Sequence, residues 1–308
     1  MKVSAVIPHS GREDHLALCL SFLKRQTMDR RDYEVIVAGH ISEDRTDIDR
    51  NSIKYLSISG EADAPFSPAK TRNAGIAAAE GDVLVFLDCD MLLSEDFLER
   101  AWNSLSQKSA LVFSLRKRLP QGLTPRHEED IRKVRCPKDE REIARAMLNR
   151  EYGEIETLWL WAYSHTMCVR REDIKYTGGF FEGFTGWGIE DTELAYRLHR
   201  AGVPVECDSD SRCYHVWHRE AYDKKRHKGY EENLRLFRSM YDDELLDGLE
   251  LCFNAFNTAA AVMSGGLTFS YVCGLCMFEA YAKGLISEKS DERMEKWKRD
   301  STAVPKQI

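Results

Sequence analysis

The sequence predicts an α/β fold with a mostly parallel central sheet, followed by a helical C-terminal extension. Short, uniformly apolar runs such as residues 83–87 (VLVFL) are too short for a helix and indicate strands buried on both faces. Segments with helical periodicity, such as residues 13–26, separate these runs along the chain. This alternation is typical of β-α-β units, which build parallel sheets.

Each element has its own local signal. Ser67 is a predicted N-cap with Pro68 at the first helical position, and Gly81 ends that helix. Further helices are predicted to begin at Ser94 and to span residues 190–201. The predicted strands are residues 3–8, 33–38, 53–58, 83–87, 110–115 and 203–207, with another strand and its approach loop within residues 159–169.

Two segments interrupt this pattern. Residues 116–150 are dense in charged side chains, which predicts a solvated insertion or lid. Residues 259–278 carry no charge and could just span a bilayer, but glycines at 265, 266 and 274 favour a buried or surface-docked helix pair.

The composition indicates an ordinary soluble protein. The hydrophobic share is 43%, the charged share is 31% and the net charge is −7, which argues against a nucleic-acid partner. Nine scattered cysteines suit a reducing compartment, and the Cys273–Cys276 pair suggests packing more than metal binding. Because the chain begins with a strand and shows no signal peptide, we expect a cytoplasmic protein, with peripheral membrane contact left open.

Asp88-Cys89-Asp90 follows the apolar strand at residues 83–87. Open α/β sheets bind ligands at the carboxyl ends of their strands, and residues two apart on an extended chain point the same way. Two carboxylates about 4 Å apart repel by about 4 kcal/mol at an effective dielectric of 20, so a cation between them would stabilise the arrangement. A plain polar turn explains the triplet alone equally well.

A second group of motifs lies further along the chain. Residues 178–191 combine several glycines with Trp187, whose flat apolar face suits a sugar, and end in Glu190 and Asp191. The simpler explanation for the two acids is that they stabilise a helix N-terminus. Two histidines, His215 and His218, follow, and we interpret them as ligands because they accompany the acidic motifs.

Four motifs in this order resemble those of family 2 and related inverting glycosyltransferases, which have the Rossmann-like glycosyltransferase A fold. They are residues 6–8 with Arg12, residues 71–77 (TRNAGIA), the Asp-x-Asp triplet, and residues 179–191. The last is similar to the acceptor segment of chondroitin polymerases and β-1,4-galactosyltransferases. The resemblance covers about residues 1–240.

The resemblance implies a role for each matching residue. Asp90 would bind Mn²⁺ or Mg²⁺, and Asp88 would hold the donor ribose or reach the cation through water. His215 would complete the metal site, with His218 as the alternative. The remaining implied contacts are Pro8, Arg12, Arg72 and Asn73 to the nucleotide-sugar donor, and Trp187, Gly188 and Glu190 to the acceptor.

Asp191 would take the proton of the acceptor hydroxyl, so that the sugar transfers with inversion from a nucleotide diphosphate sugar to a glycan or glycoconjugate. The expected division is 1–115 for the nucleotide-sugar half, 116–150 for the insertion, 151–240 for the acceptor half and 241–308 for the extension.

The sequence departs from the family where the nucleobase is usually held. An Asp is usual after the second strand, but residues 37–40 read VAGH, and Asp44 is the nearest substitute. UDP is therefore the default nucleotide, while the sugar and the acceptor are not readable.

Two other functions remain open. A non-catalytic sugar- or nucleotide-binding protein could share the fold, although such a protein would more readily have lost Asp90, Asp191 or His215. A sugar nucleotidyltransferase would need a glycine-rich basic loop after the first strand, and residues 9–13 hold one Gly and one Arg.

Overall fold

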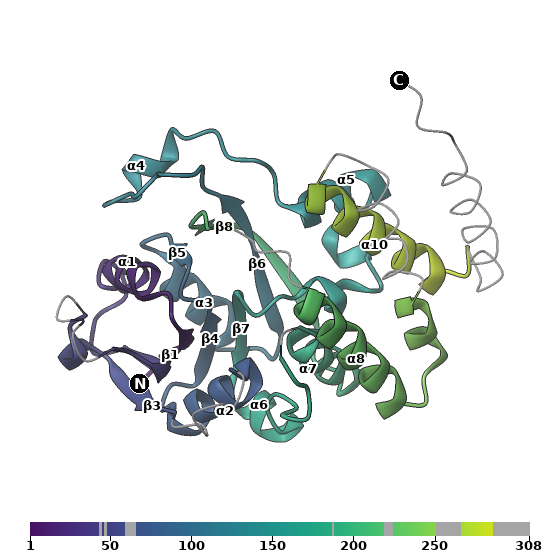
Figure 1. Cartoon of the computed structure of the whole chain (residues 1–308), viewed down its shortest axis with the longest axis horizontal. Helices are drawn as coiled ribbons and strands as arrows, with labels where there is room; N and C mark the ends of the chain where they lie inside the picture. Colours follow the sequence, from purple (N-terminus) through teal and green to yellow (C-terminus); the bar gives the residue numbers. More distant parts are fainter. Residues whose placement is uncertain are drawn as a thin grey trace. The chain divides into compact units, whose positions relative to one another are not determined.

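The computed structural model describes residues 1–42, 45, 48–58, 66–186, 188–218, 224–250 and 266–285. Eight strands of this described part form one sheet, in the order β3-β2-β1-β4-β7-β6-β8-β5 (Figure 1). Their bounds are β1 Val3–Ser10, β2 Tyr33–His40, β3 Lys54–Ser57, β4 Val83–Leu87, β5 Met91–Leu93, β6 Leu111–Arg118, β7 Thr166–Arg170 and β8 Val205–His215. The predicted α/β fold with a mostly parallel central sheet is confirmed.

The parallel part of the sheet brings three strand ends to one edge. β1 pairs in parallel with both β2 and β4, and β2 pairs in parallel with β3. The carboxyl ends of β1, β2 and β4 therefore lie together, where ligands of open α/β sheets bind. β7 runs antiparallel between β4 and β6, and the short β5 runs antiparallel to β8.

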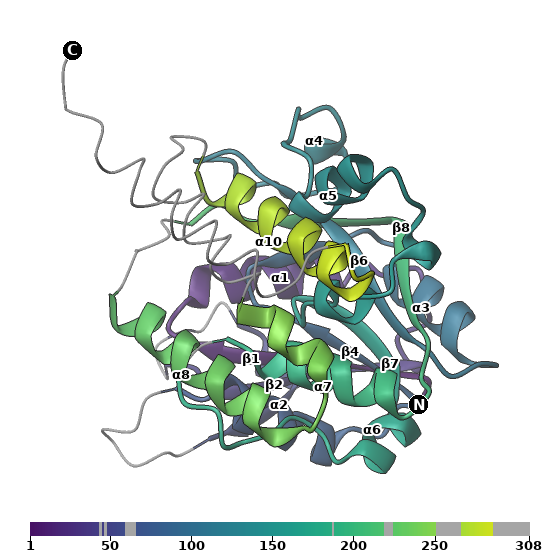
Figure 2. The ribbon, with the colours of Figure 1, turned by 90° about the vertical axis from the view of Figure 1, so that its right-hand side faces the viewer.

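Helices cover both faces of the N-terminal strands. Val3, Ala5 and Ile7 of β1 belong to a core cluster with apolar side chains of α1 (Glu13–Leu23) and α3 (Phe97–Leu105). The alternate residue Val6 faces α2 (Pro68–Ala78), where a Cβ on Gly75 would lie 2.3 Å from Val6 Cγ1. Glycine thus lets α2 approach β1 closely, and α1 and α2 lie on opposite sides of the strands (Figures 1 and 2).

The remaining α-helices that the structure describes follow β6 in the chain. The short helices α4 (Glu129–Arg132) and α5 (Glu140–Leu148) follow β6, and α6 (Arg171–Thr177) follows β7 directly. α7 (Glu190–Arg200) precedes β8, and α8 (Lys224–Met240) and α10 (Gly266–Ala282) follow it. The expected C-terminal helical extension is therefore present in α10.

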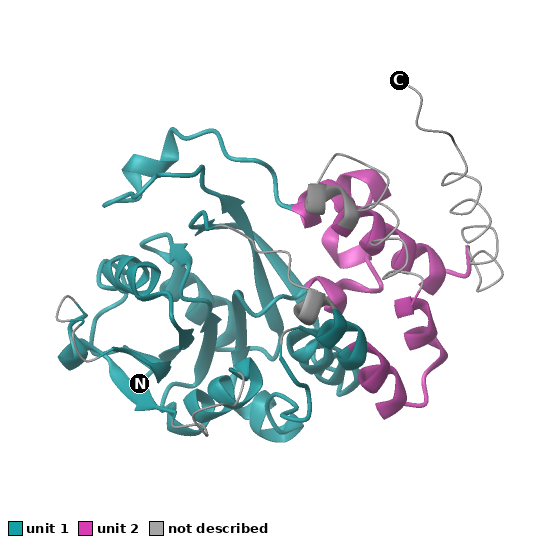
Figure 3. Cartoon of the chain, in the orientation of Figure 1, with its two compact units in different colours: residues 1–139, 162–233 teal, residues 140–161, 234–308 magenta. Residues whose placement is uncertain are grey.

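The chain divides into two compact units, residues 1–139 with 162–233 and residues 140–161 with 234–308 (Figure 3). The first unit contains the sheet. In the second unit, Glu279 of α10 accepts hydrogen bonds from the backbone nitrogen and the hydroxyl of Thr157, and the buried ring of Trp159 packs edge-on against Phe237 and Phe278.

The expected uncharged run at residues 259–278 lies only partly within the described residues. Residues 266–278 belong to α10, and residues 259–265 lie outside the described part. Among the helices that the structure describes, none is long and apolar enough to cross a membrane.

The helix signal at Ser67 is confirmed, because its hydroxyl accepts a hydrogen bond from the backbone of Lys70 and Pro68 opens α2. The short strand expected at residues 203–207 instead continues to His215, because β8 pairs along β6 and then with β5. Residues 159–169 hold a 3₁₀ turn, Leu158–Trp161, before β7 begins.

The charged segment after β6 is packed in part, where solvation was expected. Glu128 and Ile131 are 1% exposed. The Glu128 carboxylate accepts a hydrogen bond from Arg212 at 2.5 Å and another from the Tyr214 hydroxyl at 3.2 Å, both on β8. These partners explain how a carboxylate tolerates burial in this segment.

Candidate active site

Backbone pairing at the edge of the sheet brings Asp90 and His215 together. After β4, the chain turns at Asp88, whose carbonyl accepts a hydrogen bond from Met91. β5 then pairs with β8, so that Met91 lies opposite His215. The Val216 nitrogen donates to the Asp90 carbonyl at 2.8 Å, which fixes the two segments beside each other.

Asp90, His215 and His218 form a cluster whose ligand atoms lie within 4.8 Å of one another. Nε2 of His218 lies 3.3 Å from Asp90 Oδ2, and Nε2 of His215 lies 3.8 Å from the same oxygen. From the sequence, His215 was the expected metal ligand and His218 the alternative. The structure brings both imidazoles to Asp90. An edge-on contact between His218 and His15 of α1, with ring centroids 6.2 Å apart, had no signal in the sequence.

The protonation states of this cluster suit a metal site. Burial works to raise the pKa of Asp90, but the hydrogen bond from His218 and the charges of His215 and Arg12 hold it below its usual range. Burial lowers the pKa of His215 to about 3, against the pull of Asp90. At neutral pH the cluster therefore offers a carboxylate and a neutral imidazole, which are the forms that ligate divalent metals.

Arg12 reaches the same cluster from the loop after β1. Its Nη1 lies 2.5 Å from Asp90 Oδ2. The Arg12 side chain is 35% exposed, whereas that of Asp90 is 8% exposed. The two residues are separated by 78 positions in the chain, and the parallel pairing of β1 with β4 brings them together.

Asp88 lies outside the cluster of potential metal ligands found among the described residues and contacts Arg72 of α2 instead. Arg72 is 4% exposed and donates from Nη2 to Asp88 at 2.9 Å and from Nη1 to Glu190 at 3.0 Å. Burial and the neighbouring Asp191 raise the pKa of Glu190 to about 7, against the opposing effect of Arg72. One guanidinium thus joins the Asp-x-Asp motif to the acidic pair.

A strained backbone position presents the acidic pair at the start of α7. Ile189 has φ +79°, a left-handed conformation that a β-branched residue rarely adopts. Asp191 is oriented from outside its helix, because its Oδ2 accepts hydrogen bonds from the backbone nitrogen of Ser164 at 3.2 Å and from the Ser164 hydroxyl at 3.5 Å. Ser164 precedes β7 and was not singled out in the sequence.

The segment before α7 is held by α8. The Gly188 carbonyl accepts a hydrogen bond from Asn233 at 3.0 Å, and a Cβ on Gly188 would lie 2.6 Å from the Tyr230 ring. Trp187, which was expected to contact the acceptor, lies outside the described residues.

Asn73 makes its contacts with this same region of the chain. Its amide donates to the Phe180 carbonyl at 2.8 Å and accepts from the Phe180 nitrogen at 2.9 Å. A third bond, 2.8 Å long, joins the Asn73 amide to Glu182. Asn73 was expected at the donor, and here it holds the glycine-rich segment. Pro8 lies within β1, opposite Ala38 of β2.

The unusual end of β2 has a steric cause. A Cβ on Gly39, whose φ is +135°, would lie 1.9 Å from the carbonyl oxygen of His9, so no side chain fits there. The His9 imidazole is 1% exposed, and neither ring nitrogen has a hydrogen-bond partner among the described residues. Burial lowers the pKa of His9 to about 4, which keeps the ring neutral. Asp44, the expected substitute for the missing acid, lies outside the described residues.

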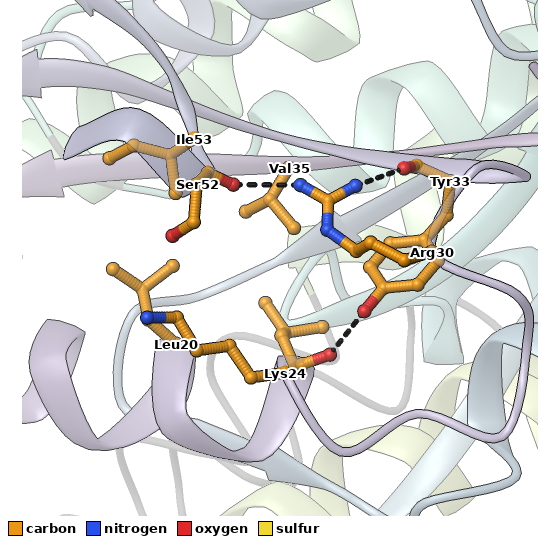
Figure 4. Close-up of a pocket in the computed structure, with 8 residues that line it drawn as sticks. Leu20, Lys24, Arg30, Tyr33, Val35, Ser52 and Ile53 are labelled. Atoms are coloured by element: carbon orange, nitrogen blue, oxygen red, sulfur yellow. Dashed lines mark hydrogen bonds between the residues drawn. The ribbon is translucent and has the colours of Figure 1, made fainter. Parts of the chain in front are cut away.

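A small pocket between α1 and β2 is separate from these motifs (Figure 4). Arg30 spans it with hydrogen bonds to the carbonyls of Tyr33 and Ser52, and the Tyr33 hydroxyl donates to the Leu23 carbonyl. The pocket's polar groups are thus bonded to one another, as in local packing. The candidate site is instead at the carboxyl ends of the parallel strands, where the motifs described above lie.

Comparisons with known proteins show which family the chain resembles. The family model described as "Glycosyltransferase like family 2" matches residues 4–243. Validoxylamine A glucosyltransferase of Streptomyces hygroscopicus subsp. limoneus is 30% identical over 257 residues, which cover 76% of this chain and 54% of that protein. Chondroitin synthase of Escherichia coli is 27% identical over 238 residues, which cover 69% of this chain and 34% of that protein.

Among solved structures, residues 1–349 of Staphylococcus aureus TarS match with a TM-score of 0.59 at 17% identity, covering 92% of each chain. The same TarS fragment has been solved with UDP and with UDP-GlcNAc. The chain spans 54% and 58% of the lengths of two validoxylamine A glucosyltransferases from Streptomyces hygroscopicus.

Proposed function

The chain belongs to the glycosyltransferase-like family 2, and from this premise we propose that it transfers a sugar, with inversion, from a nucleotide diphosphate sugar to a hydroxyl group of a glycan or glycoconjugate. We propose UDP as the nucleotide. The complexes of TarS with UDP and UDP-GlcNAc support this choice. The relatives' names, which refer to validoxylamine A and chondroitin, support an acceptor rich in hydroxyl groups.

The observation that carries this proposal is the double contact of Arg72. Its guanidinium binds Asp88 at 2.9 Å and Glu190 at 3.0 Å. Donor and acceptor chemistry must meet at one place, because the attacking hydroxyl has to reach the sugar carbon within about 3–3.5 Å. Arg72 is buried and binds one carboxylate of the Asp-x-Asp motif and one of the acidic pair, so it holds these two motifs close together.

We propose that Asp90, His215 and His218 hold a divalent cation, for which Mn²⁺ suits a mixed set of one carboxylate and two imidazoles. A bound cation would neutralise the charge that the leaving diphosphate gathers. Asp88, whose Oδ1 is bound to Arg72, would hold the donor ribose or reach the cation through water. Arg12 would bind the donor near the diphosphate.

In this proposal Asp191 is the general base and Glu190 holds the acceptor hydroxyl. The hydrogen bonds from Ser164 fix the orientation of the Asp191 carboxylate, which would accept the proton of the hydroxyl group. The deprotonated acceptor oxygen would attack the anomeric carbon on the face opposite the diphosphate. The new glycosidic bond forms as the bond to the diphosphate breaks, so the configuration inverts. Together with Glu190, Trp187 and Gly188 would form the acceptor side. The likeness of this segment to those of chondroitin polymerases and β-1,4-galactosyltransferases supports the assignment.

The test compares transfer with nucleotide binding in Asp191→Asn. We expect transfer to fall by about 10²- to 10⁴-fold, which is the usual contribution of a general base. The affinity for UDP with Mn²⁺ should stay within about twofold, because the proposal places Asp191 at the acceptor hydroxyl and not at the nucleotide. The matched control is Asp90→Asn, which should lose the Mn²⁺-dependent part of UDP binding. Full transfer by Asp191→Asn would end the base assignment.

A thermal-shift screen with UDP, GDP, CDP and dTDP, each with and without Mn²⁺, tests the nucleotide. A ligand at 100 times its dissociation constant stabilises the fold by about 2.7 kcal/mol. Stabilisation by one nucleotide only in the presence of Mn²⁺ would identify the base. Binding of a nucleotide without any transfer, in the wild-type chain and with a broad set of acceptors, would favour a non-catalytic binding protein.

A further inference from the structure

The oxygen of Asp90 that faces the two imidazoles is also the oxygen that Arg12 binds. Nε2 of His218 and Nε2 of His215 both approach Oδ2, at 3.3 and 3.8 Å. The guanidinium of Arg12 contacts this same oxygen at 2.5 Å. A cation held jointly by Asp90 and both imidazoles would take Oδ2, since this atom is their common neighbour.

A divalent cation and a guanidinium repel each other at such short range. Like charges a few ångströms apart in a partly buried site interact strongly, because the local dielectric is far below that of water. Asp90 is 6% exposed, so solvent screens this site poorly. Moreover, Arg12 already supplies the charge-assisted hydrogen bond that satisfies Oδ2. The cation must therefore displace Arg12 to use that oxygen.

Arg12 has room to move. Its side chain is 35% exposed, and the preceding residue Gly11 lies in open space, with no heavy atom within 4 Å of where a Cβ would stand. Arg12 itself precedes α1 as its N-cap and makes no side-chain capping bond there. When the Arg12 side chain releases Asp90, α1 therefore loses no side-chain capping bond.

We propose that Arg12 is a competitor of the divalent cation: it binds Oδ2 of Asp90 until the cation displaces it, and it then turns to the diphosphate of the incoming donor. This inference rests on the proposed metal site. It gives Arg12 a role in coupling the two binding events, because the metal and the nucleotide each make the other's binding easier by drawing Arg12 away from Asp90.

The experiment measures Mn²⁺ affinity of the whole chain without nucleotide, from the electron paramagnetic resonance signal of free Mn²⁺. We expect Arg12→Gln to bind Mn²⁺ about tenfold more tightly than the wild type, because a competing charge-assisted hydrogen bond is gone. Arg12→Lys, which keeps the charge but not the guanidinium, should fall between them. Arg45→Gln is the matched control: Arg45 pairs with Glu13 and Asp14, and its loss should change the affinity less than about twofold.

A second measurement repeats the titration with saturating UDP. UDP should tighten Mn²⁺ binding more in the wild type than in Arg12→Gln, because only the wild type has an arginine to move. Equal Mn²⁺ affinity of the wild type and Arg12→Gln, or weaker binding by the variant, would overturn the competition while leaving the metal site in place. Loss of binding in Asp90→Asn would support that site independently. If neither the wild type nor Arg12→Gln binds Mn²⁺ with or without UDP, the metal site itself is wrong, and the competition with it.

Discussion

Arg72 Nη1 lies 3.0 Å from Glu190 Oε1, and the side chains of these residues are 5% and 8% exposed. They come from α2 and the first turn of α7, 118 positions apart in the chain. A buried ion pair of this kind contributes little net stability, because desolvation offsets much of the attraction. Its role is geometric: it fixes the acidic pair of α7 against α2, whose Arg72 also binds Asp88.

Removing Arg72 should therefore be costly. Arg72→Gln leaves Glu190 as an uncompensated buried charge, and we expect a loss of about 3–5 kcal/mol in the free energy of unfolding. The double variant Arg72→Gln with Glu190→Gln should recover part of that loss, since Glu190 is then uncharged and only Asp88 lacks its arginine partner. Denaturation by urea measures both. Additive effects of the two substitutions would contradict the pairing.

Glu190 also predicts a pH dependence of stability. Its pKa is raised from 4.5 to about 7 by burial and by Asp191, so the native state binds this proton more tightly than the unfolded state. The stability it contributes is fully present below about pH 4.5 and is lost as the pH rises through about 7. The loss is about 3 kcal/mol, at 1.36 kcal/mol for each pKa unit. Unfolding measured between pH 5 and 8 should show a shallower decline in Glu190→Gln than in the wild type.

Asn73 could either contact the donor or support the glycine-rich segment before α7, and its substitution distinguishes these two roles. Since its amide is bonded to Phe180 and Glu182, Asn73→Ala should loosen the glycine-rich segment. We expect the KM for the acceptor to rise, while the dissociation constant for UDP stays unchanged. Glu182→Gln is the matched control, because Phe180 keeps both of its bonds to Asn73. A weaker affinity for UDP in Asn73→Ala would instead place Asn73 at the donor.

The fold and the motifs could be predicted because they rest on local patterns. The apolar run before Asp88 and the N-cap at Ser67 are properties of a few consecutive residues, and both are present in the structure. The contact of Arg12 with Asp90 depends instead on parallel pairing of β1 with β4, which no local pattern specifies. The position of both imidazoles beside Asp90 depends likewise on the pairing of β5 with β8, which brings the segment with His215 and His218 to Asp90.

Gly39 gives a test of why the usual acid is missing after β2. A Cβ there would meet the His9 carbonyl at 1.9 Å, so Gly39→Ala must push apart two paired strands, and Gly39→Asp cannot restore a nucleobase contact without the same shift. We expect either variant to lose roughly 2–4 kcal/mol of stability, from backbone strain together with overpacking. Gly122→Ala is the matched control. Gly122 has φ +80°, but its Cβ would meet nothing within 4 Å, so it should show the cost of strain alone, about 1 kcal/mol. Equal losses in thermal or urea unfolding would mean that the backbone angle, and not the contact with His9, keeps position 39 a glycine.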